Sequence, residues 1–294
     1  VSIGSSKRDK AVEVELLGEE VRIERIGTDG DMEKAAQLFR ELDGEVDAFG
    51  VGGADLGVMA DQKWYPLYSV QPMVRYIEET PVVDGAGLKN TLENQIAPYI
   101  DNHIGDYVKD KKKAFITLGV DRWGMSKSFL DAGYECVFGD LMFGLGIPIA
   151  VRSESSLKRL ASLLMPIAGR LPFEWIYPTG EKQEKREPKW EQYYDWATVV
   201  AGDCHYVKRH MPERMEGKVI ATNTTTPEDV ELFRQMGVKY LVTTTPVLEG
   251  RSFGTNMMEA ALVAAAGKGR VLTKEELSEM LAELEFEPQL QELN

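Results

Sequence analysis

The chain has 294 residues, of which 43% are hydrophobic and 28% are charged, a balance typical of a folded globular protein rather than a disordered one. Its formal net charge of −14 argues against nucleic acid and anionic membranes as partners, because both require basic surfaces. No apolar run approaches the ~20 residues of a membrane-spanning helix, and two cysteines are too few for a disulfide scaffold, so a cytoplasmic location is expected.

The first third of the chain alternates short apolar runs with amphipathic stretches. Strands are predicted over residues 1–3, 21–26, 46–51 and 81–83, and helices over 32–42, 72–79 and 88–107. Residues 9–17 are amphipathic, but their period does not decide between helix and strand. The last of these helices is expected to break near Pro98, because proline removes a helical hydrogen bond.

The same alternation continues to the end of the chain. Strands are predicted over residues 114–118, 135–138, 198–201, 218–222 and 240–244, and helices over 125–132, 155–168, 206–211, 227–236, 255–266 and 273–284. Proline, glycine and mixed charges over residues 178–192 indicate a linker. The pattern predicts an α/β protein with two Rossmann-like three-layer α/β/α halves and mainly parallel sheets, divided into residues 1–177 and 190–294.

In parallel α/β sheets, ligands bind beyond the carboxyl ends of the strands, where helix N-termini present free N–H groups. The loop after the first strand carries two hydroxyl groups and two cations, on Ser5, Ser6, Lys7 and Arg8. These groups suit a phosphate or carboxylate, so we predict that they bind an anionic substrate. The alternative is a turn whose cations simply face water.

A second loop holds four glycines within residues 50–57, directly after a predicted strand. Such a loop lets the backbone approach another group closely, and we predict that Gly52 and Gly53 contact the substrate. Glycines in such loops also serve tight turns and the packing of helices on strands, which is the alternative.

A third loop, residues 119–124, lies between a predicted strand and helix. Gly119 and Gly124 match the outer glycines of a dinucleotide-binding fingerprint, and Asp140 follows at the distance of a ribose-binding acid. Asp121 replaces the middle glycine, where a carboxylate would repel a pyrophosphate. The alternative is that Asp121 and Arg122 bind a hydroxylated substrate.

Three residues are candidates for catalysis. His205 beside Asp203 would make an oriented acid–base pair, and Cys204 at a helix start is an alternative nucleophile. Lys89 follows a glycine-containing turn and would serve as a general acid–base if burial lowers its pKa. Most lysines in a first helical turn are solvated, which is the competing interpretation.

Threonine tracts follow two further strands. Thr224 and Thr244 lie in these tracts, and Arg251 precedes the helix over residues 255–266. Hydroxyl groups and an arginine ahead of a helix N-terminus suit a cofactor phosphate, although threonine is also a common strand residue.

The segments Val-Val-Ala-Gly-Asp (199–203), Ala-Thr-Asn-Thr-Thr-Thr-Pro (221–227) and Tyr-Leu-Val-Thr-Thr-Thr-Pro (240–246) resemble bacterial quinate/shikimate 5-dehydrogenase-like proteins of Rossmann type. The resemblance implies a nicotinamide-binding fold and a catalytic lysine and aspartate, for which Lys89 or Lys63 would pair with Asp61 or Asp84. The chain departs from the family where residues 202–205 are not a glycine-rich loop and where Thr224 replaces an expected basic residue.

These features predict an NAD(P)-dependent oxidoreductase that uses NAD or NADP to act on a small hydroxy acid of quinate/shikimate type. Two alternatives remain open, a transferase or lyase with a phosphorylated or nucleotide-linked substrate, and a non-catalytic metabolite sensor. The expected partner is a small anionic metabolite, and a homodimer is the default oligomeric state. Three histidines are too few for a histidine-rich metal site, so no metal is expected.

Overall fold

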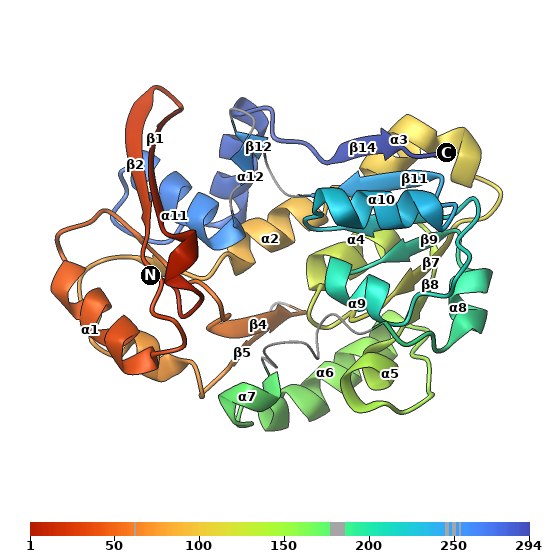
Figure 1. The fold of residues 1–294 in the computed structure, drawn as a ribbon, viewed down its shortest axis with the longest axis horizontal. Helices are drawn as coiled ribbons and strands as arrows, with labels where there is room; N and C mark the ends of the chain where they lie inside the picture. The colour runs from red at the N-terminus through yellow and green to blue at the C-terminus, as the bar shows by residue number, and fades with distance from the viewer. Residues whose placement is uncertain (62, 177–185, 245–246, 249–250, 253) are drawn as a thin grey trace.

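A computed structural model describes the chain except for residues 62, 177–185, 245–246, 249–250 and 253. The molecule has two lobes (Figure 1), a larger one around a parallel sheet and a smaller one that holds the N-terminal hairpin. Among the helices that the structure describes, none has both the length and the hydropathy that a membrane crossing requires.

The larger lobe is built on one six-stranded sheet. Its strands lie in the order β14 (Gln289–Glu292), β11 (Tyr240–Thr243), β10 (Val219–Thr222), β9 (Val199–Ala201), β7 (Lys113–Ile116) and β8 (Glu135–Phe138). Five strands are parallel, and only the edge strand β14 runs antiparallel to its neighbour. The central strands are almost wholly buried, which explains their unbroken Val, Ile and Ala sequences.

Helices cover both faces of this sheet. One face packs against α3 (Ile96–Val108), α4 (Trp123–Asp131) and α6 (Glu154–Ala168). The other packs against α5 (Asp140–Leu145), α8 (Glu191–Trp196), α9 (Cys204–Arg209) and α10 (Pro227–Gln235). The predicted α/β class and three-layer arrangement are therefore confirmed for this sheet.

The smaller lobe contains short strands and helices from both ends of the chain. Its N-terminal elements are η1 (Ser6–Arg8), β1 (Lys10–Leu16), β2 (Glu19–Arg25), α1 (Met32–Leu42), β3 (Phe49–Gly50), β4 (Gly57–Ala60), β5 (Lys63–Pro66), η2 (Gln71–Val74), β6 (Val82–Val83) and α2 (Ala86–Glu93). Further along the chain come α7 (Phe173–Ile176), β12 (Val247–Leu248), β13 (Arg251–Ser252), α11 (Thr255–Ala265) and α12 (Lys274–Glu283). Helices α11 and α12 share a core with β1, β2 and α2, and Figure 1 shows α11 beside the hairpin.

The prediction of two Rossmann-like halves differs from this structure. Strands β7 and β8 precede the predicted linker and β9, β10 and β11 follow it, yet all five belong to one sheet. The predicted division between residues 177 and 190 therefore passes through a sheet, and residues 255–284 pack with the N-terminal lobe. Most of the predicted linker lies outside the described residues, and α8 begins at Glu191.

Two local features explain the remaining differences. Residues 9–17, left undetermined from sequence, contain strand β1, which pairs with β2 across a tight turn at Leu17 and Gly18. Both turn residues have positive φ (54° and 83°), the geometry that suits a two-residue hairpin loop. The helical run over residues 88–107 breaks before Ile96, and Pro98 lies in the first turn of α3, where proline is tolerated.

The strand order places a ligand site at one position. Numbered along the chain, the parallel strands lie in the order 2-1-3-4-5, so the connections leave β7 and β9 in opposite directions. Ligands of such sheets bind in the crevice beyond the carboxyl ends of these two strands, the topological switch point. Helix α2 of the smaller lobe packs closely against α4 at this point. The absence of a side chain at Gly124 allows the close approach, because a Cβ there would lie 2.6 Å from the carbonyl oxygen of Asn90.

Candidate active site

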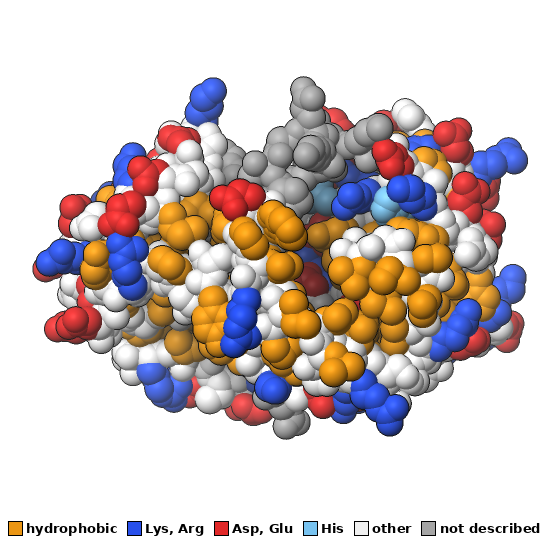
Figure 2. Space-filling view, turned by 90° about the horizontal axis from the view of Figure 1, so that it is seen from below, with side chains coloured by type: hydrophobic (Ala, Val, Ile, Leu, Met, Phe, Trp, Pro, Cys, Tyr) orange, Lys and Arg blue, Asp and Glu red, His pale blue; other side chains and the backbone are white. Residues whose placement is uncertain are grey.

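The loops that follow β7 and β9 meet helix α2 at the switch point. Thr117, Asp121 and Arg122 come from the first loop, Asp203 comes from the second, and Lys89 comes from α2. Seen from below, the molecule is hollowed between its two lobes, with acidic and basic side chains at the bottom of the hollow (Figure 2). We refer to the space among these loops and α2 as the crevice.

Arg122 connects the elements around the crevice. Its side chain is 8% exposed, and its Nη1 lies 2.5 Å from Glu93 Oε1 of α2, while Nη2 lies 2.7 Å from Asp203 Oδ2 after β9. Its Nε lies 3.4 Å from Asp121 Oδ2. A guanidinium stays charged and presents its donors in a fixed plane, so this residue holds three carboxylates from three segments in one geometry.

Lys89 points at the same group of carboxylates. Its side chain is 15% exposed, and Nζ lies 3.8 Å from Asp121 Oδ1. Burial lowers the pKa of Lys89, but the attraction of Asp121, Asp55 and Glu93 outweighs burial and the repulsion of Arg122, so the pKa is raised above its usual value. The condition set from the sequence, a pKa lowered by burial, is therefore not met, and Lys89 is a charged ammonium group beside these carboxylates.

Two carboxyl groups near Lys89, those of Asp55 and Glu93, have pKa values above the usual range of their residue types. Burial raises the pKa of Asp55, and the like charges of Asp121 and Asp84 add to the effect. Burial also raises the pKa of Glu93, which is 1% exposed. Perturbed acids of this kind collect in functional sites, because a water-poor crevice that concentrates charge changes their affinity for protons.

Several buried polar atoms in and beside the crevice have no hydrogen-bond partner. Within the described part of the chain, four buried side-chain atoms make no hydrogen bond, namely Glu93 Oε2, Thr117 Oγ1, Arg122 Nε and Ser69 Oγ, although Arg122 Nε lies in the ion pair with Asp121. The first three belong to the crevice residues and to the end of β7. An unpaired buried polar atom costs about 1–3 kcal/mol, so this concentration indicates a place prepared for the polar groups of a ligand.

Gly202 lets the two loops approach each other. Its φ is +145°, and a Cβ at this position would lie 2.0 Å from Thr117 Oγ1. Beyond it, Asp203 accepts a hydrogen bond from Asn223 Nδ2 at 2.8 Å. Although burial opposes ionisation, Arg122 and these hydrogen bonds hold the pKa of Asp203 below its usual range.

The predicted pair of Asp203 and His205 has a different arrangement. The backbone N–H of His205, rather than its ring, donates to Asp203 Oδ1 at 2.9 Å, so Asp203 serves as the N-cap of α9 and the His205 side chain is exposed. Cys204 is buried, and burial raises its thiol pKa, which is the opposite of an activated nucleophile.

The predicted dinucleotide loop does not have the geometry that a pyrophosphate requires. The N–H groups of Gly119 and Val120 donate to the carboxylate of Asp140, at 2.9 and 2.8 Å, so this acid binds the loop and not a ribose. A Cβ on Gly119 would lie 2.6 Å from the ring of Phe138, and Gly124 fits against α2. Both glycines allow packing, and this assignment from sequence is corrected.

The other residues predicted to bind a cofactor are Thr244, Thr224 and Arg251, and the structure shows no shared binding geometry for those of them whose side chains it describes. Thr244 is buried, and both its N–H and its hydroxyl group donate to the carbonyl oxygen of Thr222, at 3.0 and 3.5 Å. Thr224 is exposed in the loop after β10. Arg251 lies in β13, but its side chain is outside the described residues, so its role stays a prediction.

The predicted substrate loop at the N-terminus is occupied by protein contacts. Ser5 Oγ accepts a hydrogen bond from the N–H of Lys7, and Ser6 donates from its N–H and hydroxyl group to Asp29 at 2.8 and 2.7 Å. Lys7 is exposed, and the side chain of Arg8 lies outside the described residues. These contacts match the alternative interpretation of this segment as a turn.

The glycine loop after β3 also serves packing. A Cβ on Gly52 would lie 2.7 Å from the side chain of Ser2, and one on Gly53 would lie 2.9 Å from Ile3 Cγ1. Asp61, one of the alternative acids, pairs instead with Lys158 of α6 at 2.7 Å. Of the residues singled out from the sequence, the structure brings together Lys89, Asp121, Arg122 and Asp203, and their roles remain predictions.

Sequence reasoning missed Glu93, Asp55 and Asn223. Glu93 had a usable signal, because it follows Lys89 by one helical turn and shares its face of α2. Asp55 lies in a loop of the smaller lobe, so its approach to Arg122 depends on the packing of the two lobes. Asn223 follows β10 and reaches Asp203 across neighbouring strands of the same sheet, which the local sequence does not reveal.

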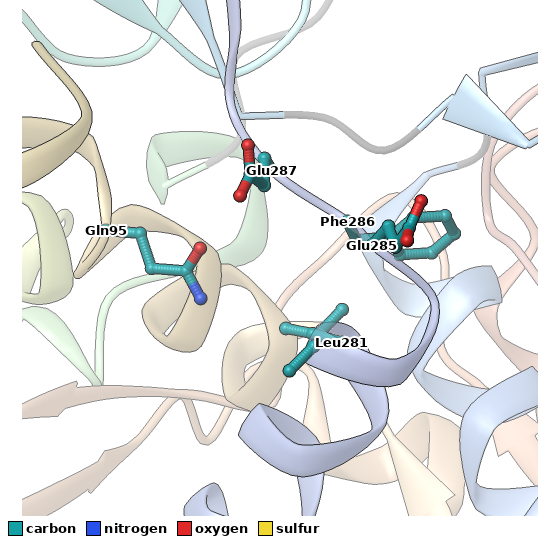
Figure 3. Close-up of a pocket in the computed structure, with 6 residues that line it drawn as sticks. Gln95, Leu281, Glu285, Phe286 and Glu287 are labelled. Atoms are coloured by element: carbon teal, nitrogen blue, oxygen red, sulfur yellow. The ribbon is translucent and has the colours of Figure 1, made fainter. Parts of the chain in front are cut away.

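A shallow depression of about 470 Å³ lies elsewhere, between Gln95 and the segment that follows α12 (Figure 3). Leu281, Glu285, Phe286 and Glu287 line it together with Gln95 and Ala282. It contains no basic side chain and none of the perturbed acids described above. This depression therefore offers none of the charged groups that meet in the crevice.

Residues 87–293 match the family model described as Domain of unknown function (DUF8754), and residues 1–84 match Domain of unknown function (DUF8753). No curated protein matches the chain. The two sequence families thus meet at the turn that precedes α2.

Three solved structures are distantly similar to the chain. The NAD-dependent malic enzyme of Thermotoga maritima is 16% identical, over 87% of this chain and 63% of that one, with a TM-score of 0.39. A putative malic enzyme is 15% identical over 87% and 65%, with a TM-score of 0.38. The 5-methylthioribose transporter solute binding protein of Thermotoga lettingae is 11% identical over 91% and 74%, with a TM-score of 0.35. The chain spans less than two thirds of either malic enzyme, and similarity at this level does not identify an activity.

Proposed function

We propose an enzymatic function for this chain, which belongs to the family described as Domain of unknown function (DUF8754). In this proposal Lys89 transfers a proton to an oxygen atom of a small hydroxylated metabolite bound in the crevice. One observation carries the proposal: a mostly buried ammonium group, next to Asp121, faces the ligand-binding edge of an α/β sheet. General acid–base catalysis requires a proton donor of this kind at the reacting atom.

The roles of the residues follow from their charges. Lys89 donates its proton to the substrate oxygen as negative charge develops there, and Asp121 stabilises the ammonium group before the transfer. Arg122 keeps Asp121 and Asp203 in position through its guanidinium group. In the reverse direction the neutral amine of Lys89 takes the proton back from a hydroxyl group.

The reaction class that we propose is the interconversion of a hydroxyl and a carbonyl group, as in an NAD(P)-dependent oxidoreductase. A nicotinamide would supply or accept the hydride. The loop predicted to bind its pyrophosphate does not fit, because Asp140 occupies the N–H groups of Gly119 and Val120. No step is therefore derived through a cofactor, and a contribution of Thr224 or Arg251 to its binding remains part of the proposal.

The same observation on Asp140 favours a second candidate, a lyase that needs no dinucleotide. In that reaction the Asp121 carboxylate removes a proton from carbon, and a carbon–carbon double bond forms. The carbon–oxygen bond breaks, and the leaving hydroxyl group takes a proton from Lys89 and departs as water. The substrate loses one molecule of water and is neither oxidised nor reduced.

Ligand-induced stabilisation separates the two candidates. Wild-type protein is melted with NAD, NADP, other nucleotides and a panel of hydroxylated metabolites, and a ligand at 100 times its Kd adds about 2.7 kcal/mol of stability. Stabilisation by a nicotinamide supports the oxidoreductase. Stabilisation by a metabolite but by neither nicotinamide favours the lyase.

Substitution of Lys89 tests the proposal itself. Lys89→Met is expected to lower kcat for the substrate found in that panel by about 10²–10⁴-fold. Lys109→Met removes an exposed lysine that pairs with Asp106 at the end of α3, so it is the matched control and should retain wild-type turnover. Wild-type turnover in Lys89→Met would remove Lys89 from the mechanism.

A further inference from the structure

The crevice contains more acidic groups than basic ones. Among the described residues, the two cations Lys89 and Arg122 interact with four carboxyl groups, those of Asp55, Glu93, Asp121 and Asp203. Asp84 adds negative charge beside Asp55. Arg122 alone is surrounded by three of these carboxyl groups, so its charge is already balanced. Among these described groups a carboxylate or phosphate would meet a surplus of negative charge in a poorly solvated space, which favours a ligand other than the small anionic metabolite expected from the sequence.

The unpaired buried atoms provide a second and independent observation. Glu93 Oε2 is an acceptor or, when protonated, a donor, Thr117 Oγ1 is both, and Arg122 Nε is a donor. All three residues are more than nine-tenths buried. Hydroxyl groups both donate and accept, so they can satisfy all three atoms, whereas a carboxylate can only accept.

The carboxylates already used by the protein limit where a ligand can bind. Asp84 accepts the N–H groups of Leu56 and Ala86, at 2.7 and 2.9 Å, and therefore stabilises the turn before α2. With the described residues, Asp121 makes ion pairs at 3.8 Å to Lys89 and 3.4 Å to Arg122, distances that leave room for closer donors. The acceptors best placed for a ligand are thus Asp121 and Glu93.

We propose that the substrate of the crevice is a polyol or amino-polyol without a carboxylate or phosphate group, bound through hydroxyl or ammonium groups that donate to Asp121 and Glu93. This inference rests on the proposed function and specifies its substrate class. A vicinal pair of hydroxyl groups spans the two acceptors. The reacting oxygen then lies beside Lys89, and Arg122 Nε donates to a neighbouring hydroxyl oxygen.

Three probes with one carbon skeleton test the charge requirement. Sorbitol is neutral, glucamine replaces one terminal hydroxyl group with an ammonium group, and gluconate ends in a carboxylate. Titration calorimetry of the wild-type protein in EDTA-containing buffer is expected to give Kd values for sorbitol and glucamine at least tenfold lower than that for gluconate. Gluconate binding as tightly as the other two, or no binding by any of them, overturns the proposal.

A substitution in the crevice tests whether its residues cause the preference for glucamine over gluconate. Asp121→Asn is expected to reduce the ratio of glucamine to gluconate affinity by about tenfold, because it removes one negative charge and keeps the side-chain shape. Asp106→Asn removes the same charge from a side chain that is 98% exposed on α3, and the ratio should stay at its wild-type value. Equal effects of the two variants would show a general charge effect and overturn the assignment to the crevice.

If Asp121→Asn does not fold, Glu93→Gln provides the second variant, because its amide keeps an acceptor toward Arg122. It is expected to weaken sorbitol binding, and unchanged sorbitol binding would overturn the role of Glu93. The binding measurements use no turnover, so they fail independently of the Lys89→Met test. Lysine-dependent turnover of gluconate would keep the proposed function and refute the substrate class.

Discussion

Glu259 packs against the first turn of α2, the helix that carries Lys89. Its ionisation should be visible in the pH dependence of the free energy of unfolding. This carboxyl group of α11 is 3% exposed, and it accepts the N–H of Leu88 in the first turn of α2 at 3.1 Å. A Cβ on Gly87 would lie 2.5 Å from Glu259 Oε1, so helix and carboxyl group are in close contact. Burial raises the pKa of Glu259 from 4.5 to about 7, although the N–H groups of α2 oppose the shift.

The sign of the pH dependence follows from this pKa. A carboxyl group with a higher pKa in the folded protein binds more protons when folded than when unfolded, at every pH between the two values. Its contribution is therefore fully present below pH 4.5 and is lost as the pH rises through about 7. Since one pKa unit corresponds to about 1.4 kcal/mol, the loss amounts to about 3 kcal/mol.

The substitution Glu259→Gln removes this titration while it keeps the side-chain shape and one acceptor for α2. Urea denaturation at intervals from pH 4.5 to 8 measures the unfolding free energy of the wild type, of the variant and of Glu279→Gln, an exposed glutamate on α12. The difference between Glu259→Gln and wild type should shift by about 3 kcal/mol in favour of the variant across this range. A difference that stays constant with pH would refute the assignment of a buried, protonated Glu259.

Three further predictions concern Arg122, Gly202 and Cys204, which lie in or next to the crevice. Arg122→Met leaves buried carboxylates without a counter-charge and should lower the unfolding free energy by roughly 3–5 kcal/mol in urea denaturation. Gly202→Ala places a Cβ 2.0 Å from Thr117 Oγ1 and should lower stability by about 3 kcal/mol in thermal melts. Gly133→Ala, where no atom lies within 4 Å, should show only its positive-φ strain of about 1 kcal/mol. Cys204 should resist iodoacetamide at pH 8 in the native protein, because burial raises its thiol pKa, and rapid labelling would contradict this arrangement.

Local signals in the sequence predicted local structure well. The amphipathic pattern of residues 32–42 coincides with α1 (Met32–Leu42), and the helix predicted over residues 227–236 matches α10 (Pro227–Gln235), which Thr226 caps. These features depend on neighbours within one or two turns, which a single sequence contains. The lobe that holds α11 and α12 depends instead on contacts across more than 200 residues, and no periodicity encodes such a partner.

The dinucleotide fingerprint shows why spacing alone does not determine a site. The distance between Gly119 and Asp140 places both at the ends of neighbouring strands, and the structure confirms that placement. Spacing does not determine which group the Asp140 carboxylate contacts. In the structure it accepts hydrogen bonds from the N–H groups of Gly119 and Val120. The loop predicted to bind a pyrophosphate and the acid predicted to bind a ribose therefore hydrogen-bond to each other. The same sequence pattern thus gives a loop whose N–H groups are already used by the protein.

Lys89 shows the corresponding limit for electrostatics. From the sequence, burial was expected to lower its pKa and make it a base, and burial does act in that direction. The sign reverses because three carboxylates attract the ammonium group. Glu93 is a neighbour on α2, whereas Asp121 comes from the loop after β7, which only the packing of the two lobes brings to Lys89. Carboxylates around an ammonium group hold its proton more tightly, so Lys89 stays charged, and the same carboxylates offset its repulsion of a second cation. In our proposal, the same acidic surroundings keep Lys89 charged and favour a substrate without a carboxylate or phosphate group.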